Sequence, residues 1–86
     1  MAITDNPTRK KANKIMLYST YSDTKKIDRL LELDAIQYTN LGVESLRSER
    51  LEVRLNSKYI YRLIRNIDLK LGKLLLRDAN TEGGKG

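Results

Sequence analysis

Residues 57–77 read SKYIYRLIRNIDLKLGKLLLR and carry the clearest periodic pattern in the chain. At 100° per residue the aliphatic side chains of this stretch gather on one face of a helix, and four cations gather on the opposite face: Lys58, Arg62, Arg65 and Lys73. The pattern predicts an amphipathic helix. Its apolar stripe needs an apolar surface to pack against, and its cationic back faces water or an anion.

Residues 43–56 allow two interpretations. In one, a short helix over 43–50 precedes a strand over 51–56, whose alternating apolar residues would pair with a strand over 15–21. In the other, a single helix of about 35 residues covers 43–77. A column of apolar residues recurs every seven positions in support of this helix: Leu46, Val53, Ile60, Ile67 and Leu74. Glu, Arg and Leu also favour helix, so we prefer the second interpretation. Gly72 inside this helix would permit close approach of another helix.

Two further helices are expected in the first half of the chain. Asn6 can cap a short helix that has Pro7 at its first position, and this helix can extend through the ambiguous segment 15–21. Ser22 or Asp23 can cap a second helix over about 24–38. A break over 39–42 follows, in which Asn40 or Gly42 suits a left-handed helix end.

Residues 24–55 have the layout of a helix-turn-helix unit whose second helix starts at Val43. Tyr38 stands where such units usually place Ala, and Ser48 stands where an apolar core residue is expected. A plain helical hairpin explains the same pattern equally well.

The length and composition predict one small domain that is stabilised by self-association. An 86-residue chain buries only about 60–65% of its unfolded surface. The chain has no Cys for disulfides and no His, so the usual stabilising devices of small proteins are missing and a homo-oligomer is expected. The predicted fold class is mainly α: a helical hairpin or small helical bundle with a long amphipathic C-terminal helix, with one short two-stranded β element as the alternative. The predicted divisions are a flexible basic arm over 1–14, a helical domain over 15–79 and a flexible tail over 80–86.

The net charge of +6 is concentrated in two segments. Residues 1–22 hold four basic and one acidic side chain, and residues 47–77 hold nine basic and three acidic ones. Concentrated positive charge is typical of surfaces that bind nucleic acid or anionic lipid, although a solvated face explains a modest excess equally well. The absence of Trp and Phe makes a membrane surface the less favoured partner.

On one long helix, basic residues spaced mostly three or four apart make a cationic strip: Arg47, Arg50, Arg54, Lys58, Arg62, Arg65, Lys73 and Arg77. Such a strip neutralises phosphates and releases their counterions without reading bases. The predicted nucleic-acid-binding residues are Arg9, Lys10, Lys11, Lys14, Arg47, Arg50, Arg54, Lys58, Arg62 and Arg65. DNA and RNA are not distinguished by this pattern.

The apolar stripe predicts an oligomer or partner interface made by Leu46, Val53, Ile60, Leu63, Ile64, Ile67, Leu71 and Leu74. It gives the alternative function: a structural or adaptor protein of a larger assembly, such as a phage particle, that binds a protein partner through its apolar helix face. Replacing Ile60 and Ile67 by Asp should abolish this function, whereas replacing Arg62 and Arg65 by Gln should spare it.

Enzyme activity is not expected. No His is present to activate a Ser or Thr, and no glycine-rich phosphate loop occurs. Asp28, Glu32 and Asp34 lie near Lys25, Lys26 and Arg29, so surface ion pairs explain these carboxylates better than a metal or acid–base site does. We expect no cofactor. No apolar run is long enough for a transmembrane helix, no signal peptide is visible, and the expected location is the cytoplasm or a particle assembled there.

Overall fold

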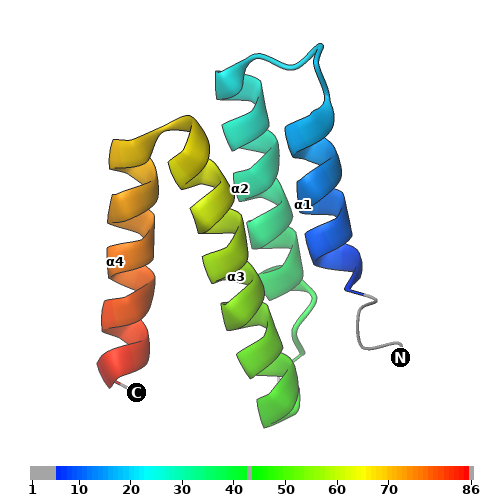
Figure 1. Cartoon of the computed structure of the whole chain (residues 1–86). Helices are drawn as coiled ribbons and strands as arrows, with labels where there is room; N and C mark the ends of the chain where they lie inside the picture. The colour runs from blue at the N-terminus through cyan, green and yellow to red at the C-terminus, as the bar shows by residue number, and fades with distance from the viewer. Residues whose placement is uncertain (1–5, 43, 86) are drawn as a thin grey trace.

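The computed structural model describes residues 6–42 and 44–85, with only the backbone described for residues 80–85. Four helices account for most of this part of the chain: α1 (Pro7–Leu17), α2 (Asp23–Thr39), α3 (Arg47–Ile67) and α4 (Leu69–Lys85) (Figure 1). The expectation of a mainly helical protein is confirmed. The two-stranded β element is absent from the described residues, because residues 15–17 complete α1 and residues 51–56 lie inside α3.

The first two helices begin at the side-chain caps that the sequence predicts. The Asn6 side chain accepts a hydrogen bond from the Arg9 backbone N–H at 3.1 Å, and Pro7 occupies the first helical position. The Ser22 hydroxyl accepts from the Lys25 backbone N–H at 3.2 Å. Each bond satisfies one of the N–H groups that lack a partner in the first turn of a helix.

The connection between α2 and α3 differs from the prediction. Helix α3 begins at Arg47, where Glu49 Oε1 accepts from the Leu46 backbone N–H at 2.9 Å. The expected start at Val43 lies outside the described residues, and the described residues on either side of it are not helical. The left-handed helix end, predicted at Asn40 or Gly42, is wrong as well. Asn40 has φ −78° and ψ −9°, and no described residue, glycine or other, has a positive φ. This longer connection does not match the short turn of a helix-turn-helix unit.

The single long helix over 43–77 is also wrong, because the chain reverses at Asp68. Asp68 adopts an extended conformation (φ −133°, ψ 99°), and its N–H donates to the Ile64 carbonyl at 2.7 Å, which ends α3. Its carboxylate Oδ1 accepts from the Leu71 N–H at 3.1 Å, which caps α4. One residue therefore terminates one helix and starts the next.

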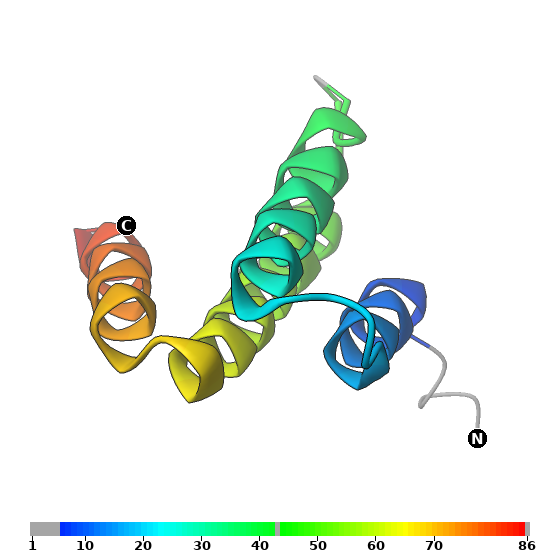
Figure 2. The same cartoon turned by 90° about the horizontal axis from the view of Figure 1, so that it is seen from above.

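Successive helices run in opposite directions, as Figure 1 shows. Helices α1, α2 and α3 pack against one another, whereas the described part of α4 packs against α3 alone. In the view from above, α4 and α1 accordingly lie on opposite sides of α2 and α3 (Figure 2). The buried centre is a cluster of Ala12, Leu30, Ile60 and Ile64, which joins the first three helices.

The division into an arm, a domain and a tail remains a prediction. Residues 7–14 of the expected arm belong to α1, and Ala12 is fully buried. At the other end, α4 continues through Lys85. Residues 1–5 and 86, which also belong to the expected arm and tail, lie outside the described residues.

Candidate nucleic-acid interface

Six cations lie in a row along α3. They are spaced three or four residues apart, opposite the side that carries the buried Val53, Ile60 and Ile64. From Arg47 to Arg65 they span about 27 Å at 1.5 Å per residue. Lys58 is half-buried and the other five are exposed: Arg47, Arg50, Arg54, Arg62 and Arg65.

Among the described side chains, no carboxylate forms an ion pair with this row of cations. Within residues 6–42 and 44–79, whose side chains are described, the only ion pair joins Arg29 and Glu32 of α2 at 2.9 Å. Arg50 bonds to a neutral partner, because its Nε donates to the Ser45 hydroxyl at 3.1 Å. The positive charge of α3 is therefore presented to solvent.

The start of α3 carries a basic hollow. Its lining is Arg47, Ser48, Arg50, Leu51 and Arg54, around a volume of about 670 Å³. Three guanidinium groups on adjacent helical turns can bond to phosphate oxygens in the bidentate manner that suits Arg.

The basic residues of α1 divide into two groups. Lys10, Lys11 and Lys14 are exposed and line, with Pro7, a second basic hollow of about 400 Å³. Arg9 is half-buried instead: its Nε donates to Asn56 Oδ1 at 3.0 Å, and its guanidinium carbon lies 4.9 Å from the centre of the Tyr59 ring. Arg9 thus holds α1 against α3, which makes it a structural residue as well as a predicted phosphate ligand.

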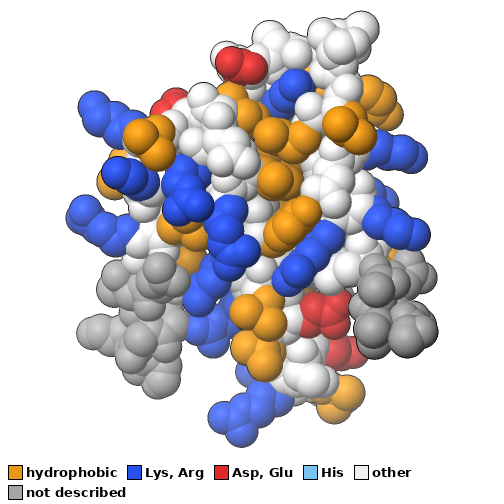
Figure 3. Space-filling view, viewed as in Figure 1, with side chains coloured by type: hydrophobic (Ala, Val, Ile, Leu, Met, Phe, Trp, Pro, Cys, Tyr) orange, Lys and Arg blue, Asp and Glu red, His pale blue; other side chains and the backbone are white. Residues whose placement is uncertain are grey.

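Helix α4 carries three cations that lie outside the predicted set of nucleic-acid-binding residues, although Lys73 and Arg77 belong to the predicted cationic strip. Because the chain reverses at Asp68, Lys70, Lys73 and Arg77 run back beside α3 instead of extending its row, and all three are exposed. Figure 3 shows Lys and Arg side chains over both helices in one view, with others at the edge formed by α1. The result is a broad basic surface two helices wide, where the sequence predicted a single narrow strip.

The eight residues of the predicted apolar interface lie in different environments. Val53, Ile60 and Ile64 are buried inside the chain, and Leu63, Ile67 and Leu71 are half-buried against this core. Only Leu46 and Leu74 are exposed, at 64% and 50%. Most of this stripe therefore packs within the protein, and the large apolar side chains left exposed on α3 are Leu51 and Leu55, on its basic side.

Sequence reasoning missed a buried polar cluster between α2 and α3. The Asp34 carboxylate accepts hydrogen bonds from Gln37, Ser57 and Tyr61, and Tyr61 OH donates to Asp34 Oδ2 at 2.6 Å. Burial, together with the bond to Asp34, raises the pKa of Tyr61 well above its ordinary value. The expected surface ion pair is found for Glu32 but not for Asp34, which is buried without a cationic partner among the described residues. The available signal was spacing, since Asp34 and Gln37 follow Leu30 on the same helix face.

Within the described residues, no group of three or more His, Cys, Asp and Glu side chains is arranged to hold a metal ion. None of the helices, as far as their residues are described, combines the length and the apolar character that crossing a membrane requires. Compared with known proteins, the chain matches no family model, no curated sequence and no solved structure.

Proposed function

We propose that this is a non-enzymatic helical protein that self-associates and binds nucleic acid through phosphate contacts. The observation that carries the proposal is the row of α3 cations, exposed over about 27 Å without carboxylate partners among the described side chains. Cations already paired with carboxylates would have to break those pairs before binding a phosphate. The α3 cations have no such cost to overcome.

The breadth of the basic surface favours contacts to phosphates over reading of bases. Lys and Arg side chains of α1, α3 and α4 bind phosphate oxygens and fix the position of a nucleic acid without distinguishing its sequence. A 27 Å row spans about eight base pairs of duplex, at 3.4 Å per base pair. The affinity is then governed by the number of counterions released, so it falls steeply as salt rises.

The small size of the core supports the proposed self-association. Only five apolar side chains are buried in the described part of the chain: Ala12, Leu30, Val53, Ile60 and Ile64. Leu51 and Leu55 are 53% and 45% exposed, on the same side of α3 as its cations. A contact between two copies at these leucines would bury apolar surface and bring two basic surfaces together beside one nucleic acid.

The second candidate function is a structural or adaptor protein of a larger assembly in the cytoplasm, such as a phage particle. The specific observation in its favour is that Leu46, Leu69 and Leu74 are each at least half exposed. Because Ile60 is fully buried, replacing it by Asp would unfold the chain and would not report on a partner. Replacing Leu74 by Asp is the informative change for this candidate.

The proposal is tested by measuring how a fluorescent duplex of random sequence binds to the full chain at low and at high salt. We expect tight binding at low salt that is lost as salt increases, with little preference between duplexes of different sequence. Absence of binding at low salt, or binding that is indifferent to salt, would contradict it. Loss of a protein partner by Leu74→Asp without any nucleic-acid affinity would favour the second candidate.

A further inference from the structure

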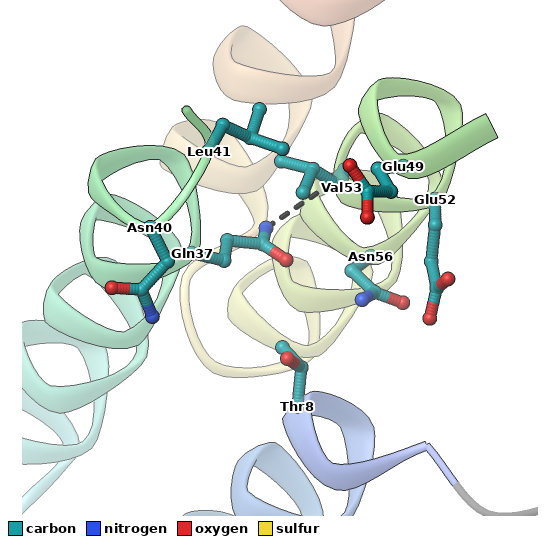
Figure 4. A pocket seen from close by; sticks show the side chains of 8 residues that line it. All are labelled: Thr8, Gln37, Asn40, Leu41, Glu49, Glu52, Val53 and Asn56. Carbon is teal, nitrogen blue, oxygen red and sulfur yellow. Dashed lines mark hydrogen bonds between the residues drawn. The ribbon is translucent and has the colours of Figure 1, made fainter. Parts of the chain in front are cut away.

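A hollow of about 300 Å³ lies where the end of α2 meets α3 and the start of α1. Its lining combines polar, acidic and apolar side chains: Thr8, Gln37, Asn40, Leu41, Glu49, Glu52, Val53 and Asn56 (Figure 4). None of the residues that we assign to phosphate binding lines it. Its volume is at the small end of the range for ligand pockets, so it suits a small group.

Gln37 gives this hollow an unused hydrogen-bond acceptor. The side chain is only 7% exposed, and three acceptors surround its Nε2: Asp34 Oδ1 at 3.0 Å, the Val53 carbonyl at 3.1 Å and Ser57 Oγ at 3.1 Å. If the N and O atoms of the Gln37 amide were exchanged, its oxygen would face the Asp34 carboxylate and the Val53 carbonyl, which are also acceptors. The hydrogen bonds therefore determine the orientation of the Gln37 amide. The Oε1 atom is buried and has no hydrogen-bond partner among the described residues.

The direction of this oxygen is visible in Figure 4. Gln37 extends from α2 toward α3, its nitrogen bonded to Val53, and its oxygen points into the space on the side of Asn56 and Thr8. An orphaned buried acceptor costs free energy that a donor placed in the hollow recovers. The occupant must therefore bring an N–H or O–H group to this point.

The other lining residues indicate the charge and the polarity of the group that carries this donor. Glu52 is exposed and has no hydrogen bond or ion pair to the described residues, so its negative charge is available at the rim. Glu49 adds a second negative charge, although its Oε1 already accepts from Leu46 N. Leu41 and Val53 supply apolar walls. A positively charged N–H donor on a short hydrocarbon chain matches the Gln37 acceptor, the negative charge at the rim and the apolar walls.

We propose that the hollow binds an alkylammonium group, with Gln37 Oε1 accepting one of its N–H bonds and Glu52 balancing its charge. This chemistry has two sources, a free alkylamine and the lysine side chain of a second copy of the chain. The site uses different residues from the phosphate-binding surface. The two proposals therefore fail independently.

The test follows the side-chain amide resonances of Gln37 in the isotopically labelled full chain during addition of n-butylammonium chloride. We expect a saturable shift of these resonances, and a much smaller one with n-butanol or with sodium chloride at equal ionic strength. Equal shifts with all three additives, or no shift with butylammonium and none on dilution of the protein, would overturn the proposal.

Variants with matched charge changes separate a specific site from general attraction. Glu52→Gln should weaken butylammonium binding by about twofold to fivefold, which is the range for one partly exposed charge pair. Asp28→Asn makes the same charge change on an exposed α2 residue outside the hollow and should leave the affinity unchanged. Equal effects of the two variants would refute a role for Glu52.

A dilution series without added amine identifies the source. Gln37 resonances that move with protein concentration, and move back when butylammonium competes, identify the lysine of a second copy as the occupant. Resonances that respond to butylammonium but not to dilution identify a free amine.

Discussion

Gly72 of α4 lies directly against the backbone of Arg65 in α3. A methyl group at residue 72 would overlap the Cα, Cβ and N atoms of Arg65, and none of these atoms is the flexible end of a side chain. The described part of α4 packs against no helix other than α3, so this close approach contributes to the position of its cations beside α3.

Gly72→Ala should therefore destabilise the protein, although Ala is the better helix former. The higher helix propensity of Ala should raise the free energy of unfolding by about 1 kcal/mol. The overlap with Arg65 forces the two helices apart, which should lower it by about 1–3 kcal/mol and also expose Leu71 and Leu75. We expect a lower urea midpoint of unfolding. Lys73→Ala, an exposed change on the same helix, is the control and should leave the midpoint unchanged or raise it slightly.

Tyr61 should make stability sensitive to alkaline pH. Its pKa is raised in the folded protein, so above pH 10 the unfolded chain loses the Tyr61 proton while the folded chain keeps it. The free energy of unfolding should then fall as pH rises, by up to about 1.4 kcal/mol per pH unit for this group. Urea titrations on either side of pH 10 measure the slope.

Tyr61→Phe isolates this contribution from the titration of lysines. The variant removes the hydroxyl that donates to Asp34 Oδ2, so we expect it to cost about 1–3 kcal/mol at neutral pH. It should also show a shallower fall of stability above pH 10 than the wild-type chain. An identical pH dependence in both proteins would be inconsistent with a half-buried Tyr61 that stays protonated in the folded chain.

Ile60 and Leu74 belong to the same seven-residue column of the sequence but should behave differently on truncation. Ile60 is fully buried, so Ile60→Ala should cost about 2–5 kcal/mol of unfolding free energy. Leu74 is 50% exposed, and Leu74→Ala should stay within about 0.5 kcal/mol. Comparable losses for both residues would mean that Leu74 is covered in solution, as it would be by a partner or a second copy.

Leu51 and Leu55 are the residues expected to join copies of the chain. The double change Leu51→Gln with Leu55→Gln removes the exposed apolar surface without altering the net charge, and it should shift the molecular mass measured by sedimentation toward that of a monomer. Leu17→Gln is the control, since Leu17 is 81% exposed at the end of α1. A wild-type chain that is monomeric at all concentrations would remove self-association from the proposal.

Local signals made part of this fold predictable. Asn6 with Pro7, and Ser22, act within one helical turn, so the starts of α1 and α2 follow from the sequence alone. Asp68 was missed because an apolar column continues across it from Ile60 through Ile67 to Leu74, and periodicity outweighed one capping residue. The favourable pairing of two antiparallel helices around Gly72 is a tertiary contact that no local pattern contains.

The candidate site was predictable in charge but not in shape. Five of the six α3 cations are exposed, as the helical projection indicated, although α4 packs against the backbone of α3 at Arg65. The position of Arg9 against Asn56 and Tyr59, by contrast, depends on how α1 crosses α3. The burial of Asp34 and Gln37 likewise results from the packing of α2 on α3. It could not be predicted from the sequence, because polar residues on a helix face are usually exposed to solvent.

If the cations of α3 bind phosphates, removing two of them must weaken the salt dependence of duplex binding. The double variant Arg54→Gln with Arg62→Gln and the control Lys25→Gln with Arg29→Gln both lower the net charge from +6 to +4, but the control changes only α2. The slope of log affinity against log salt should become shallower by about 1.8 in the α3 variant, since each lost phosphate contact contributes about 0.9. The control should keep the wild-type slope, and equal slopes for the two double variants would show that Arg54 and Arg62 do not contact phosphates.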